Sequence, residues 1–165
     1  LPDNFKNKTL NDSKKLSKNK RNEIEKIIKE ECVSFGIGSA SVKEIDEINI
    51  LNATFLAMHR AIHNINSQFE LLLIDGNRFN QYKDVSHQCI VKGDQKYNSI
   101  AAASILAKTA RDNIMKKLST EFPIYQWQNN QGYPTKIHRE AIKKHGTNKH
   151  HRKSFKLLPI QMNLF

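Results

Sequence analysis

Long hydrophobic runs are missing from this sequence of 165 residues. The longest weakly polar run is Ser99–Ala107, which is far shorter than the roughly 20 apolar residues that a membrane-spanning helix needs. The first residues, Leu1–Leu10, are polar and lack an apolar centre, so the sequence predicts no signal peptide. We therefore expect a cytoplasmic protein rather than a membrane protein.

Cysteine is also scarce. Cys32 and Cys89 are the only two cysteines, and they do not form the closely spaced pairs that are typical of zinc or redox sites. Both suit a reducing compartment as small core residues.

Acidic residues are outnumbered, with 16 Asp and Glu against 27 Lys and Arg, which gives a formal net charge of +11. A surplus of this size favours partners that carry phosphate, above all nucleic acids. A basic protein that associates with the ribosome is also compatible with the charge, but nothing else supports that reading. The length fits a single domain over residues 1–165.

The apolar pattern predicts helices that alternate with short strands, and therefore an α/β domain. The expected helices are Lys18–Glu31 with Ser17 as N-cap, a short and then a longer helix from a capping box at Ser41–Glu44 to about Ile65, Ser99–Leu118, and Lys136–Lys144 with Thr135 as N-cap. The expected strands are Val33–Ala40, Leu71–Ile74 and Cys89–Val91. On the Ser99–Leu118 helix, an apolar stripe is expected at Ile100, Ala103, Ala107, Ile114 and Leu118.

Two acids follow the second and third of these strands. Asp75 comes directly after Leu71–Ile74, and Asp94 comes three residues after Val91. Ligands bind at the carboxyl ends of strands in open α/β sheets, and carboxylates there suit Mg²⁺ in phosphodiester cleavage. The alternative is that both are ordinary turn acids, because Asp-Gly and Gly-Asp pairs are common in turns.

Asp112 is a third candidate ligand. It lies well inside the Ser99–Leu118 helix, about 20 Å along it from the start at 1.5 Å per residue. If Asp94 is near the start of that helix, Asp112 is too distant to share its metal ion. An ion pair or a capping role is then the better interpretation.

Six short motifs follow one another along the chain. They are Leu10–Leu16, Leu72–Asn77, Val91–Asp94, Ser99–Lys108 with Arg111-Asp112, Gly132–Thr135 with His138, and His151–Phe155. Each motif alone is weak, but the six in this order closely resemble ribonuclease HII, and the resemblance runs from about Leu10 to Phe155.

The resemblance implies a ribonuclease H-like mixed sheet flanked by helices, with a C-terminal helical part. It also implies an endonuclease that uses Mg²⁺ or Mn²⁺. Such an enzyme cuts the RNA strand of RNA/DNA hybrids and nicks 5′ of single ribonucleotides embedded in DNA, leaving a 3′-hydroxyl and a 5′-phosphate.

The resemblance also assigns roles to individual residues. Asp75 and Asp94 match two of the family's catalytic metal ligands. Tyr133 matches the tyrosine that stacks against the sugar after the ribonucleotide, although a turn aromatic packed on the core is an alternative. Lys14 and Arg152 match basic residues near the nucleic acid, and Arg152 could instead only brace the fold.

One family motif has no counterpart here. The family's first strand carries Gly-x-Asp-Glu-x-Gly-Arg-Gly, whose two acids complete the metal site, and the chain starts at Leu1 without it. We therefore expect the first strands to be missing and the chain as given to have little nuclease activity. A non-catalytic, basic nucleic-acid-binding remnant is the alternative, although Asp75, Asp94 and Tyr133 favour the enzyme.

The chain ends in Pro159–Phe165. Within it, Gln161, Met162, Leu164 and Phe165 resemble the short peptide by which bacterial replication and repair proteins bind the β sliding clamp. Two apolar anchors in an exposed tail can fill a groove on a partner. The alternative is that Leu164 and Phe165 fold back onto the domain.

Overall fold

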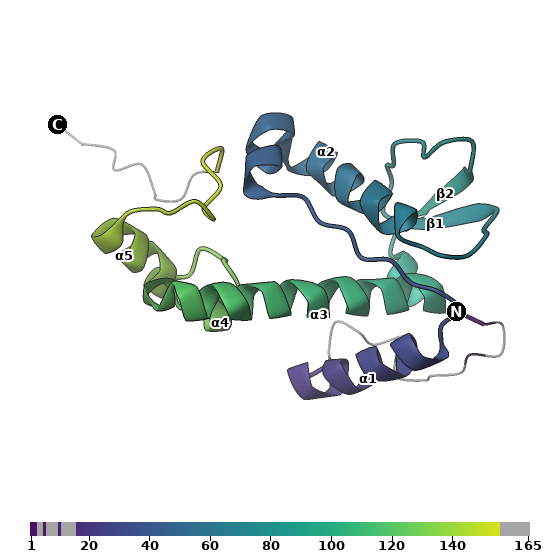
Figure 1. The fold of residues 1–165 in the computed structure, drawn as a ribbon, viewed down its shortest axis with the longest axis horizontal. Helices are drawn as coiled ribbons and strands as arrows, with labels where there is room; N and C mark the ends of the chain where they lie inside the picture. Colours follow the sequence, from purple (N-terminus) through teal and green to yellow (C-terminus); the bar gives the residue numbers. More distant parts are fainter. Residues whose placement is uncertain (3–4, 6–9, 11–15, 156–165) are drawn as a thin grey trace. The chain divides into compact units, whose positions relative to one another are not determined.

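The computed structural model of the chain describes residues 1–2, 5, 10 and 16–155 (Figure 1). Its elements are α1 (Lys18–Glu31), α2 (Val42–His63), β1 (Leu71–Asp75), β2 (Ser86–Ile90), the 3-10 helix η2 (Gly93–Gln95), α3 (Asn98–Glu121), the 3-10 helix η3 (Pro123–Tyr125), α4 (Trp127–Asn130) and α5 (Lys136–His145). None of the helices in these ranges is both long and apolar enough to cross a bilayer.

The described residues form two compact units. The N-terminal unit contains residues 1–39 and 54–110, and the C-terminal unit contains residues 40–53 and the chain from residue 111. Helices α2 and α3 each contribute residues to both units.

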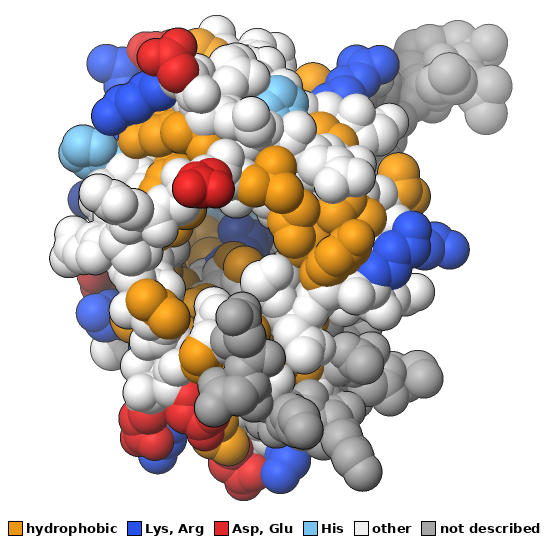
Figure 2. All heavy atoms as spheres, turned by 90° about the vertical axis from the view of Figure 1, so that its right-hand side faces the viewer, with side chains coloured by type: hydrophobic (Ala, Val, Ile, Leu, Met, Phe, Trp, Pro, Cys, Tyr) orange, Lys and Arg blue, Asp and Glu red, His pale blue; other side chains and the backbone are white. Residues whose placement is uncertain are grey.

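In the N-terminal unit, β1 and β2 form a parallel pair, with Leu71 opposite Ser86 and Asp75 opposite Ile90 (Figure 1). The described residues thus contribute a parallel pair to the α/β fold rather than a mixed sheet. Leu71 and Val91, at opposite ends of this pair, are 51% and 58% exposed. Exposed hydrophobic side chains also gather on the face shown in Figure 2.

Helix α1 forms as predicted, because the Ser17 hydroxyl accepts a hydrogen bond from the Lys20 amide at its N-terminus. Its Ile24 and Ile28 side chains are buried against residues of α3. The buried α3 residues of this core are Ala101, Ala102, Ile105 and Leu106.

The apolar stripe predicted for α3 is wrong at three positions, because Ala103, Ala107 and Ile114 are exposed. Alanines occur on several sides of this helix, so its own periodicity does not select one face. The buried face of α3 is the one that carries Ala101 and Ile105, because the isoleucines of α1 pack against it.

The strand predicted for Val33–Ala40 does not form, and this segment is extended beside the second half of α2 without joining a ladder. Side chains of α2 and of the turn that follows it bind its backbone: Arg60 donates to the Ser39 carbonyl at 2.8 Å, and Asn64 donates to the Ile37 carbonyl at 3.0 Å. Gly36 and Gly38 permit the close approach, since a Cβ on either would collide with backbone atoms of α2. Contacts distant in sequence thus replace strand pairing.

The capping box predicted at the start of α2 is confirmed. The Glu44 carboxylate accepts from the Ser41 amide at 2.8 Å, and the Ser41 hydroxyl accepts from the Glu44 amide at 3.2 Å. The short helix followed by a longer one is also confirmed, because Asn49 breaks α2 with φ 66°. The Asn49 side chain then caps the longer part by accepting from the amides of Leu51 and Asn52.

The core of the C-terminal unit is an aromatic and histidine cluster. Tyr125 stacks on Trp127 with ring centroids 5.1 Å apart, and His138 stacks on His151 at 5.4 Å. Burial lowers the pKa of both histidines, and the charge of His138 lowers the pKa of His151 further. Helix α5 holds His138 in place and forms as predicted, with Thr135 as N-cap and Gly146 as C-cap.

We expect Gly38→Ala to destabilise the N-terminal unit, because the new Cβ would overlap the Ala57 carbonyl oxygen. Overpacking of this kind costs about 1–3 kcal/mol. The measurement is the urea midpoint, with Gly76→Ala as control, since a Cβ at Gly76 meets no atom within 4 Å and only its φ of 121° opposes the change. A smaller loss in Gly38→Ala than in Gly76→Ala would contradict the close approach.

We expect the C-terminal unit to lose stability on acidification. The two histidines have their ordinary pKa when unfolded and a lower pKa when folded, so their contribution is complete above about pH 6.5. As the pH falls below that value, the unfolded chain takes up protons first and the contribution is lost. Fluorescence of Trp127, the only tryptophan, reports the transition.

The denaturant concentration at the unfolding midpoint should therefore decrease as the pH is lowered from about 7.5 to about 5. His138→Gln should flatten this dependence, whereas His145→Gln, which changes an exposed residue of the same helix, should preserve it. A midpoint that stays constant over this range in the unaltered protein would rule out the protonation account.

Candidate functional site

Asp75 is the last residue of β1, and its side chain is exposed. Its Oδ1 atom accepts a hydrogen bond from the Gly93 amide at 2.9 Å. The amide of the next residue, Gly76, donates to the Ile90 carbonyl at the end of β2. These two bonds bring the carboxyl end of β1 against the turn that follows β2.

Asp94 lies in that turn, within η2, and only 3% of its surface is exposed. Lys92 enters the turn in the left-handed conformation, with φ 56°. A Cβ at residue 93 would lie 2.6 Å from Ile100 Cδ1, so the end of that side chain would have to move, and at an ordinary contact distance of 3.5 Å from Asp75 Oδ1. The structure therefore brings Asp75 against the residue that directly precedes Asp94.

The two acids lie where the carboxyl ends of two parallel strands meet, which is the usual ligand-binding edge of an α/β sheet. Carboxylate oxygens are the ligands that Mg²⁺ and Mn²⁺ prefer, and Mg²⁺ often takes only one or two protein carboxylates together with water and substrate phosphates. Among the described residues, no group of three or more His, Cys, Asp or Glu side chains could hold a metal ion. The donor set present thus fits two ligands of such a site.

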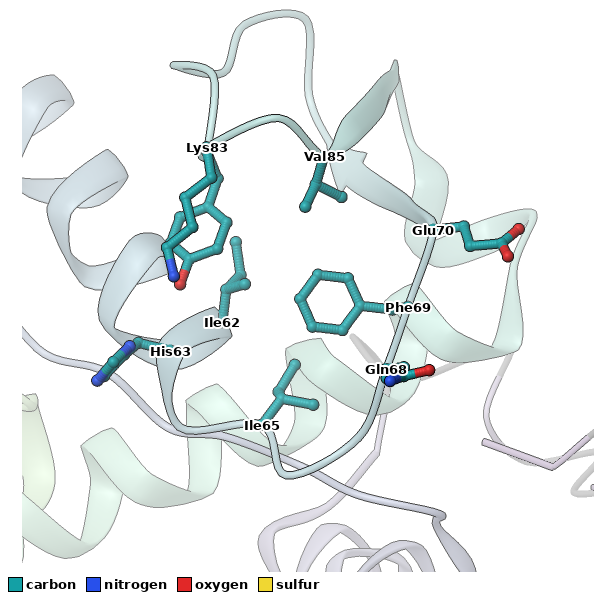
Figure 3. A pocket seen from close by; sticks show the side chains of 9 residues that line it. Ile62, His63, Ile65, Gln68, Phe69, Glu70, Lys83 and Val85 are labelled. Carbon is teal, nitrogen blue, oxygen red and sulfur yellow. The ribbon is translucent and has the colours of Figure 1, made fainter.

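A hollow of about 780 Å³ lies in the same unit, next to the amino ends of both strands. Ile62, Ile65, Phe69 and Val85 point into it, while Glu70 points away (Figure 3). Neither acid lines this hollow. It is therefore a feature separate from the Asp75 and Asp94 pair.

Tyr133 belongs to the C-terminal unit, in the turn between α4 and α5, and is 63% exposed. The backbone around it is tightly held: the Tyr133 amide donates to the Asn130 carbonyl, and Arg111 donates to the Gln131 carbonyl at 3.0 Å. Gln131 and Gly132 both have positive φ, which turns the chain sharply. The ring is therefore presented to solvent and is not part of the core.

Arg152 lies in the same unit, with its guanidinium carbon 3.8 Å from the centre of the Phe155 ring. Burial lowers its pKa, and the positive charge of Arg111 lowers it further. The following residues, Lys153 and Ser154, are held by Asp46, whose carboxylate accepts three hydrogen bonds from them.

The remaining predicted residues divide into two groups. Asp112 is buried in the α3 segment of the C-terminal unit, and its ligand role stays untested. Lys14, Gln161, Met162, Leu164 and Phe165 lie outside the described residues.

Sequence reasoning missed three residues that shape these sites: Asp46, Gly93 and Arg111. Gly93 and Arg111 are part of the motifs given above, but the sequence alone assigned no role to either residue. Asp46 gave no signal, because its partners are 107 and 108 residues away in sequence.

Comparison with known proteins shows the family to which the chain is similar. The family model described as ribonuclease HII matches residues 2–158. A ribonuclease HII of Parabacteroides distasonis is 57% identical over 99% of this chain and 82% of its own length. One of Christiangramia forsetii is 56% identical over 99% of this chain and 83% of its own length.

Among solved structures, ribonuclease H2 of Pyrococcus horikoshii has the same fold, with a TM-score of 0.71 at 21% identity. The match covers 90% of this chain and 77% of that one. The predicted α/β ribonuclease H-like fold is thereby confirmed. On the family match and the identity to its relatives, the chain belongs to the ribonuclease HII family, and so to the ribonuclease H class of hydrolases.

Proposed function

We propose that this chain contributes to an endonuclease site that cleaves the RNA strand of RNA/DNA hybrids and nicks duplex DNA 5′ of an embedded ribonucleotide. The observation that carries the proposal is the hydrogen bond from the Gly93 amide to Asp75, which joins the two acid-bearing turns. Family membership supports the reaction class, and the net charge of +11 supports a phosphate-rich substrate.

Asp75 and Asp94 are the proposed metal ligands, with Mg²⁺ or Mn²⁺ as the ion. Asp75 uses Oδ1 to hold the turn, and its other carboxylate oxygen keeps its lone pairs for a cation. When bound, the ion would activate a water and stabilise the leaving 3′-oxygen, so that the products carry a 3′-hydroxyl and a 5′-phosphate. The protein's own contribution is to fix the two carboxylates at the sheet edge before substrate arrives.

Tyr133 is the proposed contact for the sugar that follows the ribonucleotide. Its exposure and its braced turn suit a flat surface against which a nucleotide can stack. Arg152 is proposed to contact the backbone in the same unit, and Lys14 is proposed to lie near the nucleic acid. The tail residues Gln161–Phe165 remain a proposed contact for the β sliding clamp.

A non-catalytic nucleic-acid-binding protein is the second candidate. The observation that favours it is that no group of three or more His, Cys, Asp or Glu side chains among the described residues could hold a metal ion. The two candidates differ in one respect that can be measured: only the nuclease depends on the charge of Asp75.

We expect Asp75→Asn to lower the cleavage rate of an active form of the protein while the fold is preserved, because asparagine can still accept the hydrogen bond from Gly93. The assay uses a duplex with one ribonucleotide and Mn²⁺. It is run on this chain and on a fusion that places a strand with the Gly-x-Asp-Glu-x-Gly-Arg-Gly motif before Leu1. The fusion should cleave, and Asp75→Asn should lower its rate by about 100-fold or more.

The matched control is Asp84→Asn, which removes the same charge from an exposed position in the loop between β1 and β2 and should leave the rate unchanged. Equal rates for the fusion and its Asp75→Asn variant would exclude the proposed metal site. A fusion that binds the duplex but never cleaves would support the binding protein instead.

In the same fusion, we expect Tyr133→Ala to weaken processing of the single-ribonucleotide duplex and Tyr133→Phe to preserve it, because a stack requires the ring and not the hydroxyl. Loss of one stack corresponds to about 1–3 kcal/mol, or roughly 10- to 100-fold in KM or rate. Ile137→Ala, at another exposed apolar position of the same unit, is the control. Normal activity in Tyr133→Ala would refute the stacking role.

A further inference from the structure

Asn130 lies at the end of α4 and is buried, with only 8% of its surface exposed. Its Nδ2 atom donates to the Tyr125 carbonyl at 2.7 Å, and its Oδ1 atom accepts from the Gly132 amide at 2.8 Å. Its backbone carbonyl accepts from the Tyr133 amide, also at 2.8 Å. A flipped side-chain amide would set its oxygen against the Tyr125 carbonyl, so these bonds fix Asn130 in one orientation.

The bond to the Tyr125 carbonyl connects Asn130 to the core of the C-terminal unit. Tyr125 is 3% exposed, and its ring stacks on Trp127. Its hydroxyl donates to the Gly146 carbonyl at 2.9 Å. Tyr125 is therefore held at its ring and at its hydroxyl, and Asn130 is bonded to a fixed part of the core.

The turn that Asn130 holds has a backbone conformation that needs support. Gln131 has φ 52° and Gly132 has φ 77°, so two consecutive residues are left-handed. A residue other than glycine persists in this conformation only where its surroundings hold it there. Asn130 supplies two of the hydrogen bonds that hold this turn, and Arg111 supplies a third by donating to the Gln131 carbonyl.

The turn in its own right determines where the Tyr133 ring points. The residue is 63% exposed, so most of its surface meets solvent rather than the core. Its backbone, in contrast, is held on both sides: the amide donates to the Asn130 carbonyl, and the carbonyl accepts from the Thr135 amide at 2.8 Å. The direction of the ring therefore depends on the backbone that carries it.

We propose that Asn130 is the positioning residue for Tyr133 and so sets how firmly the chain binds the sugar that follows the ribonucleotide. The inference rests on the proposed function, because that function supplies the sugar contact of Tyr133. A stack against a flat ring requires the ring to be in place before the nucleotide arrives, since ordering it on binding would cost affinity. The buried amide of Asn130 provides this order by linking the turn to the core.

The experiment measures the affinity of the full chain for a duplex with one ribonucleotide, without divalent metal. Tyr133→Ala should lower the affinity about 10-fold or more, as expected for one lost stack. Asn130→Ala leaves the ring but frees the turn, and it should lower the affinity severalfold. In the Tyr133→Ala background, Asn130→Ala should have almost no further effect, because both changes act through one ring.

A second measurement reads the turn directly and needs no nucleic acid. The Tyr133 amide should exchange its hydrogen about 10-fold faster or more in Asn130→Ala than in the unaltered chain, because the turn opens more often. The matched control is Asn129→Ala, the same change at the exposed preceding residue of α4, which should leave both the affinity and the exchange rate unchanged.

Gly132→Ala tests the turn while Asn130 stays in place. The new Cβ would meet Met115 Cε at 3.4 Å, an ordinary contact, so the positive φ is what opposes the change. This variant should also lower the affinity severalfold, and it should likewise have little effect in the Tyr133→Ala background. It keeps the test decisive if Asn130→Ala does not fold.

Full additivity of Asn130→Ala with Tyr133→Ala would show that Asn130 only supports the fold, and it would overturn the proposal. Unchanged exchange at the Tyr133 amide in Asn130→Ala would overturn it as well. Normal binding by Tyr133→Ala, or no binding by the unaltered chain, would instead contradict the proposed sugar contact. The exchange rates would then still decide whether Asn130 holds the turn.

Discussion

The hydrogen bond from the Gly93 amide to Asp75 Oδ1 joins the ends of the two strands, and the candidate site depends on it. Parallel strands place their carboxyl ends at one edge, and the register that sets Asp75 opposite Ile90 makes the two turns meet there. The left-handed conformation of Lys92 then turns the chain, and the Gly93 amide meets the carboxylate. The result is one buried acid, Asp94, and one exposed acid, Asp75, in adjoining turns.

In the C-terminal unit, Tyr133 and Arg152 both lie on short irregular segments rather than on helices or strands. Packed rings around Tyr125 and Trp127 supply its core. Side chains then hold the loops: Arg111 braces the turn before Tyr133, and Asp46 braces the segment after Arg152. Neutral histidines complete the cluster, so the integrity of this unit is tied to pH through the same residues that pack it.

The features that could be predicted from the sequence are those with local causes. The caps at Ser17, Ser41 and Thr135 lie within a few residues of the amides they bind, so helix starts were predicted correctly. The strand prediction for Val33–Ala40 is wrong, since the backbone of this segment is bound by Arg60 of α2 and by Asn64 just after it, which the local pattern does not reveal. The role of Asp46 was hidden for the same reason, because a single carboxylate gives no sign of partners a hundred residues away.

The central claim is that Asp75 and Asp94 share one divalent ion at the sheet edge. The most direct test is the affinity of Mn²⁺ for the unaltered chain and for Asp75→Asn and Asp94→Asn, measured by electron paramagnetic resonance with a non-cleavable duplex bound. We predict that each substitution weakens the same Mn²⁺ site by about 10-fold or more and that the double variant loses that site. Equal Mn²⁺ affinity in all of these proteins would contradict the claim.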